Sequence, residues 1–159
     1  AFKLAIKLGI PTVAVIRNPL ECISSSMVKY REELKLKKFP IYPIYDYIFF
    51  HKALFKYKRK ITILSFEATI EDPIYYYLKL ENELGINNTN DVKDLKSIQL
   101  KVNEKLNDSS FDHNNIDALK KGPDPGKELL KAEAKAIIDK NTKMKTEAIK
   151  VYNKLIKCA

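Results

Sequence analysis

The sequence contains few of the residues that build metal sites, disulfides or tight backbone turns. Its 159 residues include two cysteines, two histidines, four glycines and no tryptophan. Cys22 and Cys158 lie near opposite ends of the chain without CxxC spacing, and His51 and His113 are isolated from both. We therefore expect neither a disulfide framework nor a zinc site, and a reducing compartment, cytoplasmic by default.

Long apolar runs and phosphate-binding glycine motifs are also missing. No apolar run approaches the roughly 18 residues that span a bilayer, and the start has no signal-peptide pattern. With glycines only at positions 9, 85, 122 and 126, the sequence has no GxxxxGK[ST] loop. Because the chain also starts without Met, we expect it to be part of a longer protein.

What the sequence does have is an excess of positive charge. Lys and Arg number 29 against 20 Asp and Glu, a formal charge of +9, and 45% of the residues are hydrophobic. Residues 1–80 carry 14 basic and 7 acidic side chains, whereas the rest carry 15 and 13. The chain has enough apolar residues for one globular domain, and its first half favours anionic partners: nucleic acid, an anionic membrane or a phosphorylated small molecule.

Hydrophobic patterning and turn residues predict helices alternating with two strands in the first half. The predicted helices cover residues 2–8, 18–37, 45–57, 72–84, 92–106, 127–139 and 142–156, and the predicted strands residues 12–16 and 61–66. This order indicates an α/β protein with a parallel sheet. Two strands are too few for a stable sheet, so we expect flanking strands before Ala1. Residues 1–159 are predicted to form one domain, α/β over 1–86 and mainly helical over 87–159.

The candidate site lies just after the first predicted strand. Arg17 is the first residue past that strand, where ligands of α/β sheets collect, and Asn18 with Pro19 begins a helix. The residues expected to pack this helix on the sheet recur at steps of three and four: Leu20, Ile23, Met27, Tyr30 and Leu34. Ser25 lies about 200° from Ile23 and is expected to face away from the core, on the face of Asn18 and Cys22. Arg17 and Ser25 are therefore predicted to clamp one phosphate.

These residues carry a family resemblance. Arg17-Asn18-Pro19, with Ser25 eight residues after the arginine, resembles the segment with which sulfotransferases hold the 3′-phosphate of 3′-phosphoadenosine 5′-phosphosulfate (PAPS). Residues 63–67, 71–73 and 84–86 are similar to the strand and helix that follow in that family. Lys120-Lys121-Gly122-Pro123 is similar to its late basic-Gly turn, which in several members closes over the same nucleotide.

The resemblance implies a fold and an activity. The fold would be a P-loop NTPase-like three-layer sandwich with a parallel sheet, incomplete at its N-terminus and followed by a helical part. The activity would be transfer of a sulfuryl group from PAPS to a hydroxyl or amine acceptor without a metal, with Arg17, Asn18, Ser25, Lys120, Lys121 and Gly122 binding the donor. The family's N-terminal phosphosulfate loop and catalytic His or Glu have no counterpart here, so the catalytic residues are unassigned and this chain alone is expected to be inactive.

Two other functions are compatible with the sequence. One is a P-loop kinase relative that uses the same strand-Arg-helix geometry for ATP. The other is a non-enzymatic module that binds nucleic acid through the basic run at residues 56–60 and the C-terminal lysines, which would give steep salt dependence. Glu67, just after the second strand, is expected to cap or pair locally.

Overall fold

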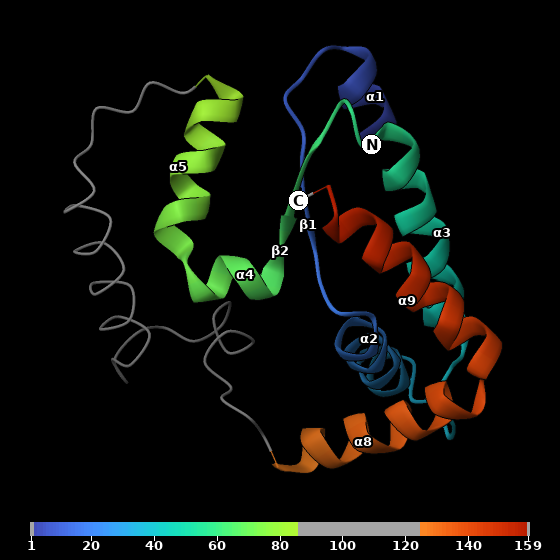
Figure 1. Cartoon of the computed structure of the whole chain (residues 1–159). Coiled ribbons are helices and arrows are strands. Elements are labelled where there is room, and N and C mark those ends of the chain that lie inside the picture. Colours follow the sequence, from blue (N-terminus) through green and yellow to red (C-terminus); the bar gives the residue numbers. More distant parts are fainter. Residues whose placement is uncertain (1, 86–124, 159) are drawn as a thin grey trace.

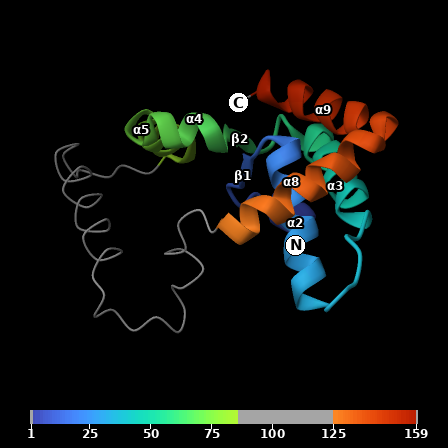
Figure 2. The same ribbon diagram turned by 90° about the horizontal axis from the view of Figure 1, so that it is seen from below.

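Two short parallel strands lie between two groups of helices in a computed structural model that describes residues 2–85 and 125–158 (Figure 1). Strand β1 (Val13–Ile16) pairs with β2 (Thr62–Ser65) in the register Val13 to Thr62 through Ile16 to Ser65. The helices α4 (Phe66–Glu71) and α5 (Pro73–Leu84) lie on one side of the strands, and α3 (Tyr42–Tyr57) and α9 (Thr142–Ile156) on the other (Figures 1 and 2). The remaining described helices are α1 (Phe2–Lys7), α2 (Pro19–Glu33) and α8 (Pro125–Lys140).

Local capping chemistry sets the ends of two predicted helices. The Asn18 side chain accepts a hydrogen bond from the Leu20 amide at the start of α2, and Asp72 caps α5. Gly85 ends α5 in the left-handed conformation with φ 64°, which glycine adopts without steric cost. The helix starts at Asn18 and Asp72 and the Gly85 end are confirmed.

Other boundaries differ from the predictions. Helix α2 ends at Glu33 rather than near Lys37, because Lys35 adopts φ 50° and interrupts helical backbone. Helix α3 begins at Tyr42, three residues earlier than predicted, since proline at position 43 is tolerated in a first turn. Helix α4 was not predicted. The helix predicted over residues 92–106 lies outside the described residues.

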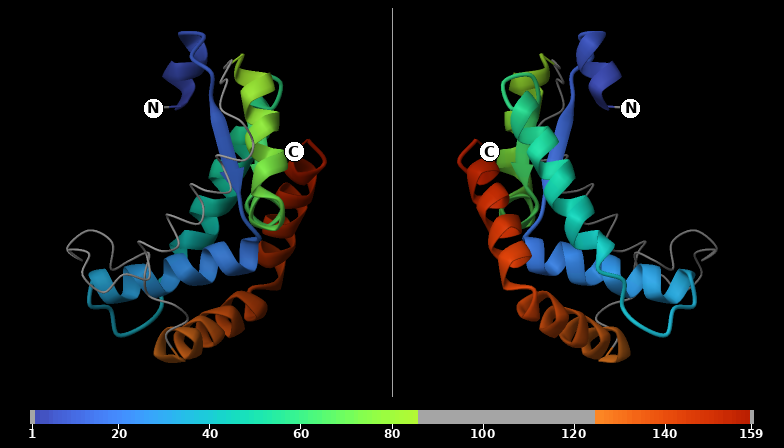
Figure 3. Two further views of the ribbon diagram at one scale, coloured as in Figure 1. Left: turned by 90° about the vertical axis from the view of Figure 1, so that its left-hand side faces the viewer. Right: turned by 90° about the vertical axis from the view of Figure 1, so that its right-hand side faces the viewer.

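The helices bury their apolar stripes mainly against one another. Helix α2 packs along α8 at one end of the molecule, and α3 packs along α9 (Figure 3). The larger apolar cluster joins these four helices and consists of Ile23, Met27, Val28, Ile44, Tyr47, Ala134, Ile138, Ala148 and Val151. A second cluster includes residues of both strands and consists of Ile16, Leu54, Ile61, Ile63 and Leu155. Of the stripe predicted on α2, Ile23 and Met27 are buried, whereas Leu34 lies past the helix end and is exposed.

The expected P-loop NTPase-like three-layer sandwich is wrong. The described part of the chain is mostly helical, and its sheet has two parallel strands. The parallel pairing of the two strands, which the alternation of helices and strands predicted, is confirmed. A pair four residues long, however, offers too little apolar surface to carry a helical layer on each face, so the helices pack on one another.

The sequence predicts no transmembrane segment, and the lengths and apolar content of the described helices bear on that prediction. Across residues 2–85 and 125–158, none of them is long and apolar enough to cross a lipid bilayer.

Candidate functional site

The parallel register brings together the residues that follow the two strands. Ile16 pairs with Ser65, so Arg17 and Asn18 emerge beside Phe66 and Glu67. The Asn18 amide donates a hydrogen bond of 2.8 Å to Glu67 Oε1, although the two residues are far apart in the sequence. The Arg17 guanidinium carbon lies 4.8 Å from the centroid of the Phe66 ring. This junction after both strands is the first part of the candidate site.

Glu67 is the most heavily hydrogen-bonded side chain of this junction. Its Oε2 accepts hydrogen bonds of 3.3 Å from Ser65 Oγ and from the Tyr152 hydroxyl of α9. Partial burial alone raises the pKa of the Glu67 carboxyl, but the bonds from the Asn18 amide, its own amide, Ser65 and Tyr152 outweigh burial and lower that pKa. We expected Glu67 to cap or pair locally, but only Ser65 is a local partner, since Asn18 and Tyr152 are far from Glu67 in the sequence. Glu67 carries its negative charge at the start of α2.

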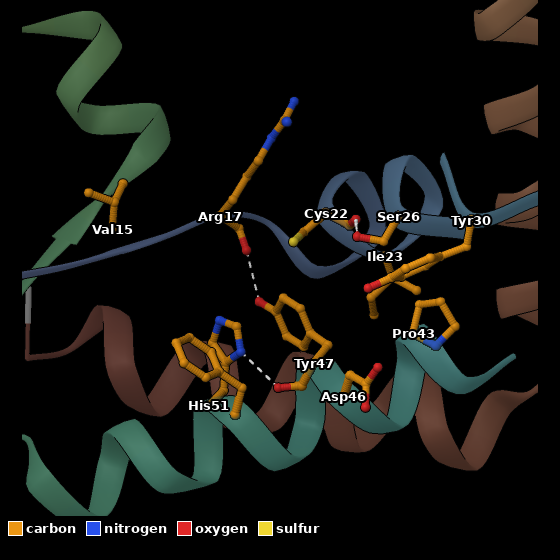
Figure 4. Close-up of a pocket in the computed structure, with 11 residues that line it drawn as sticks. Val15, Arg17, Cys22, Ile23, Ser26, Tyr30, Pro43, Asp46, Tyr47 and His51 are labelled. Carbon is orange, nitrogen blue, oxygen red and sulfur yellow. Dashed lines mark hydrogen bonds between the residues drawn. The ribbon is translucent and has the colours of Figure 1, made fainter. Parts of the chain in front are cut away.

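Arg17 presents an unpaired cation at the junction. Its main-chain carbonyl accepts a 2.8 Å hydrogen bond from the Tyr47 hydroxyl, which fixes the backbone after β1. Its side chain extends away from Tyr47 and His51 (Figure 4). The guanidinium pairs with no carboxylate within residues 2–85 and 125–158. It is therefore available to an external anion.

The three serines of α2 differ in their hydrogen bonding. Ser24 is fully buried and donates to the Glu21 carbonyl at 3.2 Å, and Ser26 donates to the Cys22 carbonyl at 2.9 Å. Ser25 is half-buried, and its hydroxyl has no hydrogen-bond partner in the described part of the chain. Among these serines, Ser25 thus has a hydroxyl left for a ligand.

The other predicted ligands divide into two groups. Asn18 acts as a helix cap, because its side-chain oxygen already accepts from the Leu20 amide at 3.0 Å. Lys120, Lys121 and Gly122 lie outside the described residues. The structure thus gives Asn18 a local structural role and places Arg17 and Ser25 on one strand-helix unit.

A pocket that the sequence did not predict lies between α2 and α3. Its volume is about 270 Å³ (Figure 4). Its lining residues come from the end of β1 and from the two helices: Val15, Arg17, Cys22, Ile23, Ser26, Tyr30, Pro43, Asp46, Tyr47, Phe50 and His51. Ser25 is not among them.

Two buried rings, Tyr47 and His51, form one wall of this pocket. They stack with centroids 3.7 Å apart, and His51 Nδ1 lies 2.8 Å from the Tyr47 carbonyl oxygen. Burial lowers the pKa of His51, against the opposing effect of that hydrogen bond, and burial raises the pKa of Tyr47. Burial likewise raises the pKa of the Cys22 thiol despite the nearby Arg17 charge.

The sequence alone predicted no functional role for Tyr47 or His51. Their spacing of four residues places them on neighbouring turns of one helix and was the available signal. The spacing of these two residues does not, however, reveal the pocket beside them, because α2 supplies the opposite wall of that pocket.

The described segments hold no group of three or more Cys, His, Asp or Glu side chains that could bind a metal ion. Comparison with family models, curated proteins and solved structures finds no match. The geometry at the strand ends is therefore the basis for a functional assignment.

Proposed function

We propose that this protein functions in sulfuryl transfer from PAPS, and that Arg17 and Ser25 hold the 3′-phosphate of that donor. One observation carries the proposal. Arg17 and Ser25, eight residues apart, are a cation and a hydroxyl that have no carboxylate or hydrogen-bond partner, respectively, in the described structure. Their spacing is the one that resembles the 3′-phosphate segment of PAPS-dependent sulfotransferases.

The chemistry of the two side chains suits a phosphate group. A guanidinium donates two parallel charge-assisted hydrogen bonds to phosphate oxygens, and a serine hydroxyl donates a third from another direction. The Ser26 hydroxyl already donates to the Cys22 carbonyl, and the Asn18 side-chain oxygen already accepts from the Leu20 amide. Arg17 and Ser25 are therefore the main donors to the phosphate, and the amide NH2 group of Asn18 is a further donor at the helix start.

Glu67 determines where along α2 the phosphate lies. Its ionised carboxylate takes the Asn18 amide at the helix start and repels a second anion there. Ser25 lies roughly 10 Å further along the helix axis. A phosphate held between Arg17 and Ser25 lies away from Glu67, so the helix dipole contributes little to its binding.

Holding the 3′-phosphate fixes the register of the donor. A nucleotide anchored by its 3′-phosphate holds its phosphosulfate at a defined distance from Arg17 and Ser25. Such positioning lowers the entropic cost of transfer. In the reaction, the acceptor oxygen or nitrogen forms a bond to sulfur and releases its proton, the bond from sulfur to the bridging phosphate oxygen breaks, and adenosine 3′,5′-bisphosphate leaves. Arg17 and Ser25 act on binding, and the residues that stabilise the leaving oxygen are unassigned.

The test is calorimetric titration of the full chain with adenosine 3′,5′-bisphosphate and with 5′-AMP, which lacks the 3′-phosphate. We expect the bisphosphate to bind more tightly. Because a charge-assisted contact is worth about 1.5–3 kcal/mol, Arg17→Ala should weaken that binding tenfold or more, and Ser25→Ala should weaken it by a smaller factor.

Matched controls are available on the same elements. Ser26→Ala removes a neighbouring serine that already donates to a carbonyl, and Arg59→Ala removes an exposed arginine after α3. Both should leave bisphosphate binding unchanged. Equal affinity for the bisphosphate and 5′-AMP, preference for ATP, or no loss in Arg17→Ala would overturn the proposal.

A further inference from the structure

Helix α9 carries a row of lysines along its exposed side. A hollow of about 430 Å³ on this side is lined by Thr146, Ile149, Lys150, Asn153, Lys154 and Lys157. The three lysines among them are exposed. The opposite side of α9 is buried in the protein through Ala148, Val151 and Leu155. The apolar side of this helix is therefore covered by the fold, and its basic side is open.

A second basic segment, at the end of α3, meets this row. Helices α3 and α9 lie side by side (Figures 1 and 3). Lys58 Nζ, just after α3, lies 4.3 Å from the centroid of the Phe55 ring, and Lys154 Nζ of α9 lies 5.6 Å from the same centroid. Both distances are within the range of a cation–π interaction. The Phe55 ring thus brings together lysines from the two basic segments, which are far apart in the sequence.

These lysines have little negative charge to balance them. Glu147 is the one acidic residue of α9, and it forms a 2.8 Å ion pair with Lys52 of α3. The hydrogen bond and charge of Lys52, with a smaller effect of Lys150 and Lys154, lower the pKa of the Glu147 carboxyl, so Glu147 is ionised and balances one lysine. No ion pair within residues 2–85 and 125–158 involves the four lysines that we call the α9 basic face: Lys58, Lys150, Lys154 and Lys157.

The side chains of the α9 basic face favour one class of anionic partner. A helix that binds a membrane surface inserts apolar side chains into it, but the apolar side of α9 is buried in the protein. The centre of a protein–protein interface is rich in aromatic residues and depleted in lysine. The α9 basic face instead offers a row of ammonium groups with the Asn153 amide and the Thr146 hydroxyl beside them. Such groups contact the phosphates of nucleic acids.

We infer that the α9 basic face binds the phosphodiester backbone of a nucleic acid without reading its sequence. Lys150, Lys154 and Lys157 follow one side of the helix, and Lys58 adds a charge from the end of α3. Phosphates that pair with these lysines release counterions, and contacts to phosphates carry no sequence information. The inference does not rest on the proposed function, because the α9 basic face shares no residue with the pair Arg17 and Ser25.

The experiment measures the binding of a fluorescent single-stranded DNA of about 15 nucleotides and mixed sequence to the full chain. Fluorescence anisotropy is followed over salt concentrations from roughly 50 to 200 mM. Each neutralised phosphate of a single strand contributes about 0.7 to the fall of log K with log salt, so four lysines predict a slope of about −3.

A double variant tests the lysines against a matched control. Lys154→Gln combined with Lys157→Gln should weaken binding about fivefold or more at the lowest salt and make the slope shallower by about 1.4. Lys37→Gln combined with Lys38→Gln removes the same charge from exposed residues after α2 that line no part of the hollow, and it should change neither quantity. Glutamine is a good helix former, so the substitutions in α9 and at its end leave the fold intact.

Several results would overturn the inference. They are an equal loss of affinity in the two double variants, a slope near zero, and binding of poly-glutamate or of vesicles of phosphatidylserine and phosphatidylcholine as tight as that of the DNA. Displacement of the DNA by an equal concentration of adenosine 3′,5′-bisphosphate would also overturn it, because the DNA would then occupy the site of Arg17 and Ser25.

Discussion

The four-helix cluster of α2, α3, α8 and α9 differs sharply from the junction after the strands. In the cluster, nearly every buried side chain is apolar and contacts its neighbours on the other helices. At the junction and the adjoining pocket, the Arg17 guanidinium, the Ser25 hydroxyl and His51 Nε2 lack protein hydrogen-bond or charge partners within the described segments, while Glu67 is fully engaged. The comparison separates residues that stabilise the fold from residues left for a ligand, and substitutions test that separation.

The largest effect is expected in the four-helix cluster. Ile138 of α8 is 0% exposed, so Ile138→Ala leaves a cavity and should lower the free energy of unfolding by about 2–5 kcal/mol. Leu129 lies on the same helix and is 70% exposed, and Leu129→Ala should change stability by less than about 0.5 kcal/mol. Urea denaturation measures both. Similar losses in the two variants would contradict this packing of α8.

The junction after the strands stabilises the fold through the hydrogen bonds of Glu67. Glu67→Ala removes the acceptor of the Asn18 amide and the Tyr152 hydroxyl and should cost about 1.5–3 kcal/mol in denaturation experiments. Glu67→Gln retains an acceptor oxygen and should cost less.

Acidification provides a second test of this residue. The folded-state pKa of Glu67 is lowered from its usual 4.5, so its contribution is present above that pH and is lost as pH falls through the folded-state pKa. Glu67→Gln should flatten this acid dependence of stability. An unchanged slope would show that the carboxylate is not held by these bonds.

His51 should make stability depend on pH in a different range. Its folded-state pKa lies below the usual 6.5, so the unfolded chain takes up the proton first. Stability should fall as pH drops from above 6.5 through the folded-state pKa, by at most about 1.4 kcal/mol per pH unit for one proton. His51→Leu should remove this dependence. Thermal unfolding across that range measures it, and an identical pH profile for both proteins would refute a buried neutral His51.

The smallest effects are expected at the proposed phosphate ligands. Arg17→Ala loses a contact with the Phe66 ring worth about 0.5–1 kcal/mol. Ser25→Ala should change stability by less than about 0.5 kcal/mol, since its hydroxyl has no partner in the described segments. A loss above about 2 kcal/mol in either variant would assign that residue to the fold instead of to a ligand.

Several features of the site could be predicted from the sequence because they depend on near neighbours. Asn18 before Pro19 indicated a helix start, and the helical period kept Ser25 off the fully buried positions of α2. Glu67 was expected to pair locally, but its partners Asn18 and Tyr152 could not be named. Helix α4 was missed because Phe66 extends the apolar run of β2, which hides the capping role of Ser65.

The sequence by itself determined the starts of α2 and α5 and the end of α5, since caps and glycine ends act within a few residues. It also determined that a cation follows β1 directly. Only the tertiary structure decided that two strands lack the surface to carry helical layers, that Glu67 reaches Asn18 and Tyr152, and that α2 and α3 enclose a pocket in front of His51. These outcomes depend on which apolar faces bury each other, and that choice is made among elements far apart in the chain.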